Sequence, residues 1–186
     1  MITAEESLSA KIQRYVTDYP DESVFIHKFQ VLLEHADAFQ RTHLPGHITA
    51  SAFIVSEDMT QILLVHHAKL NKWLQPGGHA DGDTHVTRVA LREGNEETGL
   101  QHLQLTTADI FDLDIHPIPA RKDLQEHDHY DVRFLVIASV QEKIIVSEES
   151  HDVKWVPVAE LEKYNDEKSI LRMKAKLLQQ IATRNK

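Results

Sequence analysis

The sequence predicts an α/β fold, an α/β/α sandwich whose mixed sheet carries helices on both sides, preceded by an N-terminal helical extension. Short apolar runs bounded by turn residues predict strands, notably at residues 48–56 and 130–140. Apolar residues at helical spacing predict a long C-terminal helix. With 186 residues and no repeat or low-complexity tract, the chain suits one domain with a proper core. We expect residues 1–45 to form the extension and residues 46–186 the main domain.

The extension is expected to consist of two helices, because residues 5–42 lack the alternation of a strand. Tyr19-Pro20-Asp21 separates the helices, and Leu44-Pro45-Gly46 ends the extension. We expect the extension to pack on the main domain. The sequence leaves open whether it also forms a dimer contact or covers the substrate.

The first strands are expected as a hairpin, in which residues 48–56 and 61–67 flank a turn at residues 57–60. Residues 73–78, with the sequence WLQPGG, are expected to form a short strand that runs into a glycine turn.

The second half of the chain begins with an extended segment at residues 103–115 and a loop rich in proline and charge at residues 116–127. Residues 130–140 are apolar on both faces at their centre, which predicts an internal strand. The remaining elements are expected, in order, as short strands at residues 143–146 and 153–156, a short helix at residues 158–164 and a long helix from residue 166 to the C-terminus.

Residues 92–99, with the sequence REGNEETG, concentrate charge on one helix. At about 100° of turn per residue, Glu93, Glu96 and Glu97 share roughly one quarter to one third of the helix circumference. Like charges this close raise one another's pKa unless a cation lies among them. Hard oxygen ligands suit Mg²⁺ or Mn²⁺, and such ions serve phosphate chemistry. The segment therefore predicts a metal-phosphate site.

A solvated helix face is the simpler alternative for these acids. However, Val86, Val89 and Ala90 occupy the same arc one to two turns earlier. A stripe that is apolar first and acidic afterwards places its acids at the edge of a core. This order favours the site.

Residues 78–100 resemble the signature of the Nudix hydrolase (MutT-like) family, G-x5-E-x7-R-E-U-x-E-E-x-G-U, in which U is a bulky aliphatic residue. The signature aligns without a gap, and the resemblance implies the Nudix fold over roughly residues 46–165. The matching positions are Gly78, Arg92, Glu93, Glu96, Glu97, Gly99 and Leu100.

Two positions depart from the signature. Thr84 replaces the first glutamate, which in the family mainly braces the loop and the helix, often through the arginine; the neighbouring Asp83 is placed to take over that role. Gly94 replaces an aliphatic residue and costs about 1 kcal/mol relative to alanine in a helix, so we expect it to serve close packing. Neither departure touches the three acids.

The resemblance also implies roles for individual residues. Glu96 and Glu97 would bind the metal directly. Glu93 would be a further ligand or the group that orients and deprotonates the attacking water. Arg92 would hold the acids through a bidentate pair. The backbone carbonyl just before the signature, that of Gly77, would complete the metal shell.

Another acid is expected from a late loop, because family members often place one a few residues before a tryptophan. Trp155 is that landmark here, and Glu149 is the best positional match, with Glu148 second. An ordinary charged turn is the alternative reading of these two glutamates.

Three residues are candidates for substrate contacts. His67 ends the strand opposite the signature, where relatives often place a basic residue, and the same reasoning covers Lys69. Trp73 could stack on a base, although a core or rim tryptophan is an equal alternative.

The resemblance implies hydrolysis of a diphosphate linkage by water attack on phosphorus, with one to three Mg²⁺ or Mn²⁺ ions. A nucleoside diphosphate derivative or related small molecule is favoured as substrate. Two rival functions are a Nudix-fold isopentenyl-diphosphate isomerase and a ligand-binding sensor. The first relies on a cysteine, which this chain lacks, and only Thr84 favours the second.

Composition excludes several other classes. Without cysteine there is no disulfide framework or zinc-thiolate site. No apolar run approaches a membrane span and the N-terminus lacks a signal-peptide pattern, so we expect a cytoplasmic protein with no membrane partner. The net charge of −9 disfavours a nucleic-acid polymer and favours a small-molecule partner. A homodimer is left open.

The 13 histidines show no HExxH or Cys/His spacing of the kind that marks a zinc site. We expect most of them to be surface or strand-end residues that form local hydrogen bonds.

Overall fold

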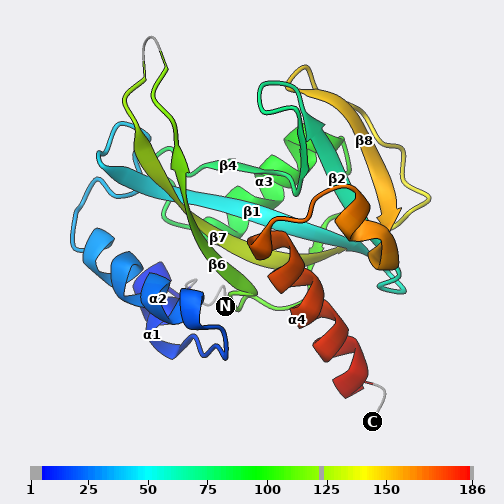
Figure 1. The fold of residues 1–186 in the computed structure, drawn as a ribbon, viewed down its shortest axis with the longest axis horizontal. Helices are drawn as coiled ribbons and strands as arrows, with labels where there is room; N and C mark the ends of the chain where they lie inside the picture. Colours follow the sequence, from blue (N-terminus) through cyan, green and yellow to red (C-terminus); the bar gives the residue numbers. More distant parts are fainter. Residues whose placement is uncertain (1–5, 122–123, 185–186) are drawn as a thin grey trace, which may run out of the picture. The chain divides into compact units, whose positions relative to one another are not determined.

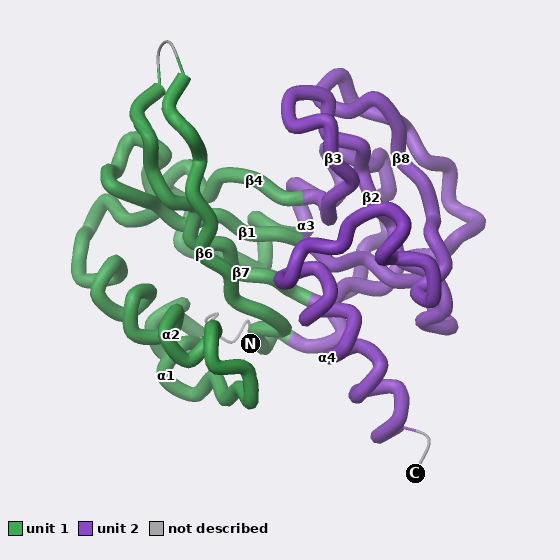
Figure 2. The backbone as a smooth tube through the Cα atoms, in the orientation of Figure 1, with its two compact units in different colours: residues 1–51, 77–90, 108–134 green, residues 52–76, 91–107, 135–186 purple. Residues whose placement is uncertain are grey.

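The computed structural model describes residues 6–121 and 124–184 (Figure 1). Residues 1–5, which begin the expected extension, and residues 185–186, which end the expected C-terminal helix, lie outside the described part, as do residues 122–123 of the expected loop. The chain divides into two compact units (Figure 2). Unit 1 comprises residues 1–51, 77–90 and 108–134, and unit 2 comprises residues 52–76, 91–107 and 135–186.

Two helices, α1 (Leu8–Arg14) and α2 (Pro20–Leu32), form the N-terminal part of unit 1. Ser7 begins α1 by accepting a hydrogen bond from the Ala10 amide at 3.3 Å. Pro20 is the first residue of α2, a position where its missing N–H removes no helical hydrogen bond. The break predicted at residues 19–21 is thus confirmed, with the proline beginning the second helix.

The helices of unit 1 pack on its strands. Glu22 of α2 is buried and accepts a hydrogen bond from the backbone amide of Leu113 at 2.9 Å. Phe29 is fully buried, and its ring meets that of Tyr130 edge-on at 5.2 Å. The Lys11 ammonium reaches the carbonyl of Ala108 at 2.6 Å. The boundary expected at residue 45 between an extension and a main domain stays a prediction.

The strands of unit 1 pair in antiparallel ladders. The first half of β1 (Gly46–Ser56) pairs with β4 (Gly77–His79), with Thr49 opposite His79 and Ser51 opposite Gly77. β6 (Asp112–Ile118) pairs with the first half of β7 (His127–Ala138) over seven successive positions, from Asp112 opposite Arg133 to Ile118 opposite His127.

The strands of unit 2 are built around β2 (Gln61–His67), whose centre is buried. β2 pairs antiparallel with the second half of β1, with β3 (Lys72–Leu74) and with β8 (Ser150–Pro157). β5 (Gln104–Leu105) pairs with the second half of β7. β1, α3 (Val86–Thr98) and β7 each contribute residues to both units.

Two further helices end the chain in unit 2. The short helix expected at residues 158–164 is the 3₁₀-helix η1 (Val158–Lys163), and the long C-terminal helix is α4 (Lys168–Arg184). The apolar face of α4 buries Ile170, Met173 and Leu177. None of the helices in the described part of the chain combines the length and the apolar character that crossing a membrane requires.

The α/β class predicted from the sequence, a mixed sheet with helices, is confirmed. The prediction of a strand at residues 143–146 is wrong, because this segment lies against the C-terminal end of α3 and is not paired with a strand. The Ile145 amide donates to the carbonyl of Thr98 at 2.8 Å, which satisfies one of the helix's terminal carbonyls. Gly99, with a φ of 77°, leaves the room for this approach, since a Cβ there would lie 2.9 Å from the Ile145 nitrogen.

A buried ion-pair network occupies the interior of unit 1. The Arg133 guanidinium lies 2.7 Å from Asp131, 3.2 Å from Asp112 and 3.0 Å from Asp114. Burial acts to lower the pKa of Arg133, but the three carboxylates outweigh burial and raise the pKa, so the charge is retained. Asp131 also accepts hydrogen bonds from Ser51, at 2.8 and 2.9 Å, which connects β1 to the network.

Replacing Arg133 with Met should therefore destabilise the protein by about 3–5 kcal/mol, because it leaves three buried carboxylates without their cation. Urea unfolding followed by circular dichroism would measure this loss. The control is Arg14→Met, since Arg14 forms its ion pairs with Glu6 and Asp109 at the surface and should matter little. Equal effects of the two substitutions would contradict the structural role of the network.

Candidate active site

Helix α3 carries the acidic segment predicted from the sequence. Its early residues Val86, Val89 and Ala90 are almost completely buried. One turn later the side chain of Glu93 is 13% exposed, and Glu97 is also buried, at 8%. The apolar stripe thus continues into acids that lie at the edge of the core.

Arg92 forms ion pairs with two of these acids. Its Nη1 atom lies 2.8 Å from Glu93 Oε1 and 3.3 Å from Glu96 Oε2. The pair with Glu96 has the i,i+4 spacing of neighbouring turns, and the Glu96 side chain is 56% exposed. Arg92 therefore bridges two carboxylates and restrains their rotamers.

The pKa of Glu93 depends on its burial and on the charges around it. Burial raises its pKa, the Arg92 charge lowers it, and the charges of Glu96 and Glu149 raise it further. The net pKa is raised, and burial is the largest cause. A divalent cation bound beside Glu93 would favour the charged carboxylate and so act against the effect of burial.

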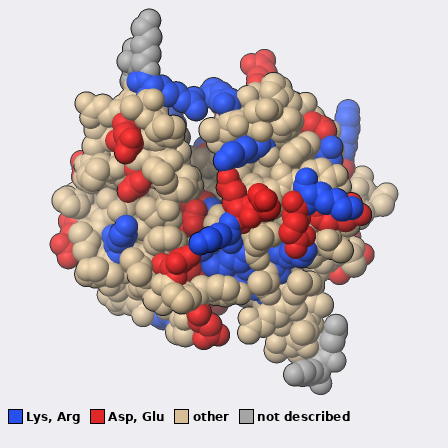
Figure 3. Space-filling model, viewed as in Figure 1, with Lys and Arg blue, Asp and Glu red and all other residues tan. Residues whose placement is uncertain are grey.

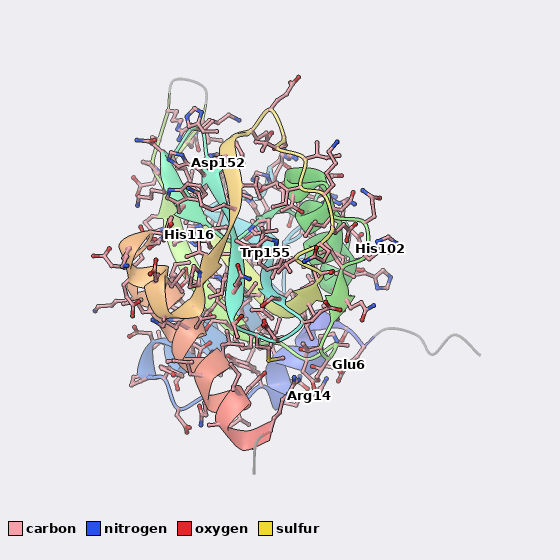
Figure 4. All side chains as sticks on the ribbon, turned by 90° about the vertical axis from the view of Figure 1, so that its right-hand side faces the viewer. Glu6, Arg14, His102, His116, Asp152 and Trp155 are labelled. Carbon is pink, nitrogen blue, oxygen red and sulfur yellow. The ribbon has the colours of Figure 1, made fainter. Side chains whose placement is uncertain are left out.

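Glu149 lies close enough to α3 for its charge to act on Glu93. Its backbone carbonyl accepts a hydrogen bond from Ala68 at 2.9 Å, which ties the Glu149 loop to the turn after β2. Trp155, the landmark used to select Glu149, lies on β8, the strand that this loop enters (Figure 4). Glu148 is exposed in the same loop.

The carboxylates of Glu93, Glu96, Glu97 and Glu149 fit a hard divalent cation. Oxygen donors with uncompensated charge are the donor set that Mg²⁺ and Mn²⁺ prefer. Of these carboxylates, Glu93 and Glu97 lie on α3 near the core, and Glu149 lies in the loop before β8.

Gly77, the expected source of a metal-binding carbonyl, lies on β4 in unit 1 opposite Ser51. A Cβ at this position would lie 2.9 Å from the Ser51 Cα, so only glycine allows the two strands to approach this closely. Its role in the metal shell stays a prediction.

The two departures from the signature have local explanations. Asp83 pairs with Arg88 at 2.7 Å and accepts a hydrogen bond from the His85 amide at 2.9 Å, so it braces the loop where α3 begins. At Gly94, a Cβ would lie 2.8 Å from Leu103 Cδ1, which confirms the expected close packing. Thr84 is exposed.

The three candidate substrate residues lie at the end of β2 and on β3. His67 Nδ1 accepts a hydrogen bond from the Lys69 amide at 3.2 Å, and Lys69 is exposed. Trp73 stacks on His66 at 4.8 Å with an interplanar angle of 12°, and its carbonyl accepts from Asn165. Trp73 is therefore a rim tryptophan that already has aromatic partners. The substrate roles of all three residues stay predictions.

The contacts of Lys154 and Tyr164 with Trp73 were not predicted from the sequence. The ammonium of Lys154 lies 4.3 Å from the centre of the Trp73 ring, and Tyr164 meets the ring edge-on at 5.7 Å. The only sequence signal is the alternation of Asp152 and Lys154 on β8, and the strand register alone brings Lys154 to this ring. On the face shown in Figure 3, acidic and basic side chains are interspersed.

Comparison with known proteins is consistent with this geometry. A family model described as the NUDIX domain matches residues 45–177. A "probable DHNTP pyrophosphohydrolase" of Lactococcus lactis subsp. cremoris is 29% identical over 140 residues, which cover 74% of this chain and 81% of that protein.

Two solved structures share the fold. An Ap4A hydrolase from C. elegans has a TM-score of 0.60 and 18% identity, covering 73% of this chain and 98% of that one. The MutT protein from Methanosarcina mazei Go1 has a TM-score of 0.58 and 20% identity, covering 73% and 95% respectively.

Glu93→Gln should stabilise the metal-free protein at pH 7. The raised pKa means that the charged form of Glu93 is less favourable in the folded than in the unfolded chain, so removing the charge removes that cost. The gain should shrink as the pH falls through the folded pKa and vanish below the unfolded value of about 4.3. Urea unfolding in the presence of a chelator at several pH values would measure it, and a destabilised variant at pH 7 would contradict the argument.

The packing at Gly94 gives a second prediction. Gly94→Ala should change stability by less than about 1 kcal/mol, because the helix gains propensity while the flexible end of Leu103 moves aside. Gly94→Leu, the aliphatic residue of the signature, should cost about 1–3 kcal/mol through overpacking against Ala52 and Ile54. Thermal unfolding of both variants would test this; a Leu variant as stable as the wild type would show that the helix can shift.

Proposed function

The chain belongs to the Nudix family and is a hydrolase that acts on diphosphate linkages, and we propose that it uses Mg²⁺ or Mn²⁺ to hydrolyse a small-molecule substrate. The proposed substrate class is a nucleoside diphosphate derivative or a related small molecule. The observation that carries the metal dependence is the raised pKa of Glu93 among the charges of Glu96 and Glu149.

Three carboxylates would hold the cation: those of Glu96, Glu97 and, from the late loop, Glu149. A bound divalent cation neutralises diphosphate oxygens and lowers the pKa of water. Arg92 contacts Glu93 and Glu96 and keeps both carboxylates in place. Glu97 is buried and its side chain has little freedom to move.

Glu93 is the proposed base. A carboxylate with a raised pKa accepts a proton near neutral pH more readily than a solvated glutamate does. Glu93 would orient the attacking water and take its proton while the water oxygen bonds to phosphorus. The bridging oxygen leaves with the other phosphate, so the products are two phosphate monoesters, for example a nucleoside monophosphate and X-phosphate.

The substrate is to be identified by assay of a panel of compounds. The Lactococcus lactis relative is named as a probable pyrophosphohydrolase of DHNTP, so this triphosphate belongs in the panel beside nucleoside diphosphate derivatives and nucleoside triphosphates. For the nucleoside diphosphate derivatives, a phosphatase added to the reaction would convert monoester products to inorganic phosphate. The triphosphates are themselves substrates of a phosphatase, so their products would be separated by chromatography.

Turnover of the best substrate should require Mg²⁺ or Mn²⁺ and stop on addition of a chelator. Glu93→Gln and Glu97→Gln should each lower kcat by about 10²–10⁴-fold. The matched control is Glu57→Gln, an exposed glutamate in the turn between β1 and β2, which should keep wild-type activity. Activity that persists in both site variants would contradict the proposal. A folded, metal-binding chain that turns over nothing would instead support the sensor alternative.

Glu149 can be tested separately through the metal dependence of the rate. If Glu149 is a ligand, Glu149→Gln should raise the Mg²⁺ concentration that gives half-maximal activity, while kcat at saturating Mg²⁺ changes little. Glu148→Gln, one residue away in the same loop, serves as the control. Identical Mg²⁺ titrations for the wild type and Glu149→Gln would show that Glu149 is not a ligand and that this loop is an ordinary charged turn.

A further inference from the structure

Five histidine rings gather at strand ends and edges in unit 1. His47 begins β1, His79 ends β4, His127 and His129 begin β7, and His116 lies on β6 (Figure 4). The ring of His47 lies 5.0 Å from those of His127 and His129 and 5.2 Å from that of His79. His116 pairs across the ladder with His129, and their rings lie 5.5 Å apart.

Two of the five rings, those of His47 and His127, are buried, and the other three are partly buried. His47 is 1% exposed and His127 is 5% exposed. The Nε2 atoms of His47 and His129 are buried and have no hydrogen-bond partner among the described residues. A buried polar atom without a partner is costly and calls for an explanation, such as an ion that the atom binds.

In His47 and His127, the hydrogen bond of Nδ1 determines which ring nitrogen can bind a metal. Nδ1 of His47 lies 3.3 Å from the carbonyl of His43, and Nδ1 of His127 lies 2.8 Å from the carbonyl of Gln125. A carbonyl can only accept, so each Nδ1 carries the proton and each Nε2 keeps a free lone pair. Histidines that bind metals are oriented in this way, by a second hydrogen bond to a backbone carbonyl.

We propose that His47, His127 and His129 form a binding site for a divalent transition-metal ion, with Zn²⁺ as the best match. One ligand atom from each of the three residues lies within 4.8 Å of the others. A tetrahedral zinc site with bonds of 2.0–2.1 Å needs these nitrogens about 3.4 Å apart, a change that small ring rotations supply. The fourth position of a tetrahedral site of this kind can be taken by a solvent molecule.

This site differs in chemistry from the carboxylate site of α3. Imidazole nitrogens select Zn²⁺, Cu²⁺ or Ni²⁺, whereas oxygen ligands select Mg²⁺ or Mn²⁺. It also differs from the group of His35, Asp37 and His43, because two of those three residues are exposed. The proposal does not rest on the proposed function.

The test uses the full chain after treatment with a chelator, with Co²⁺ as the spectroscopic probe. We expect one equivalent of Co²⁺ to give the intense visible absorption of a tetrahedral site, and one equivalent of Zn²⁺ to abolish it. His127→Gln and His129→Gln should each weaken Co²⁺ binding at least tenfold. The controls are His102→Gln, an exposed histidine elsewhere, His35→Gln in the alternative group, and Glu97→Gln in the carboxylate site.

All three controls should give the tetrahedral Co²⁺ absorption of the wild type, which reports the histidine site and not the carboxylate site. Binding that is lost in His35→Gln or Glu97→Gln, or kept in both cluster variants, would overturn the proposal, as would the absence of any tetrahedral Co²⁺ signal. Should the cluster variants fail to fold, zinc-edge X-ray absorption of the wild type decides the question. A first shell with three imidazoles at about 2.0 Å supports the site, and a shell of oxygen alone overturns it.

Discussion

A single buried guanidinium, that of Arg133, holds the polar interior of unit 1 together. Burying a charge is unfavourable unless it is paired, and carboxylates from β6 and β7 provide the pairing. Asp131 extends the network to Ser51 of β1, and Gly77 of β4 approaches the backbone of Ser51. The ion-pair network therefore connects β6, β7 and β1, and β4 packs closely on the β1 residue that joins it.

The ion-pair network and the histidine cluster lie on the same face of strands β6 and β7. On β7, His127, His129, Asp131 and Arg133 alternate in sequence and so point to one side. The ladder places His116, Asp114 and Asp112 of β6 opposite the last three of them. The ion pairs at one end of this face thus fix the strand register that brings the histidines together at the other end, which is the kind of support a preorganised binding site needs.

In helix α3, by contrast, the acidic residues are held in an unfavourable electrostatic environment. Its first turns bury apolar residues and favour folding, while in its later turns the burial of Glu93, and the charges of Glu96 and Glu149, oppose the charged form of Glu93. The net pKa of Glu93 stays raised although Arg92 acts to lower it. Functional sites commonly accept such a local cost to stability, and a cation that stabilises the carboxylate can also assist the reaction. The electrostatic cost at Glu93 and the proposed chemistry are therefore two consequences of one arrangement.

The sequence by itself determined the features that depend on neighbouring residues: the acidic stripe of α3, the glycine that ends it, the helices and most strands, and the family. These follow from helical spacing and backbone propensity, which act over a few residues. Only the tertiary structure decided the rest. Residues 143–146 have the composition of a strand, but they lie against the end of α3, where the Ile145 amide donates to the carbonyl of Thr98. The charge of Glu149 on Glu93 and the histidine cluster both join residues that are distant in the chain. Strand register and loop placement create those contacts, and a local pattern does not encode them.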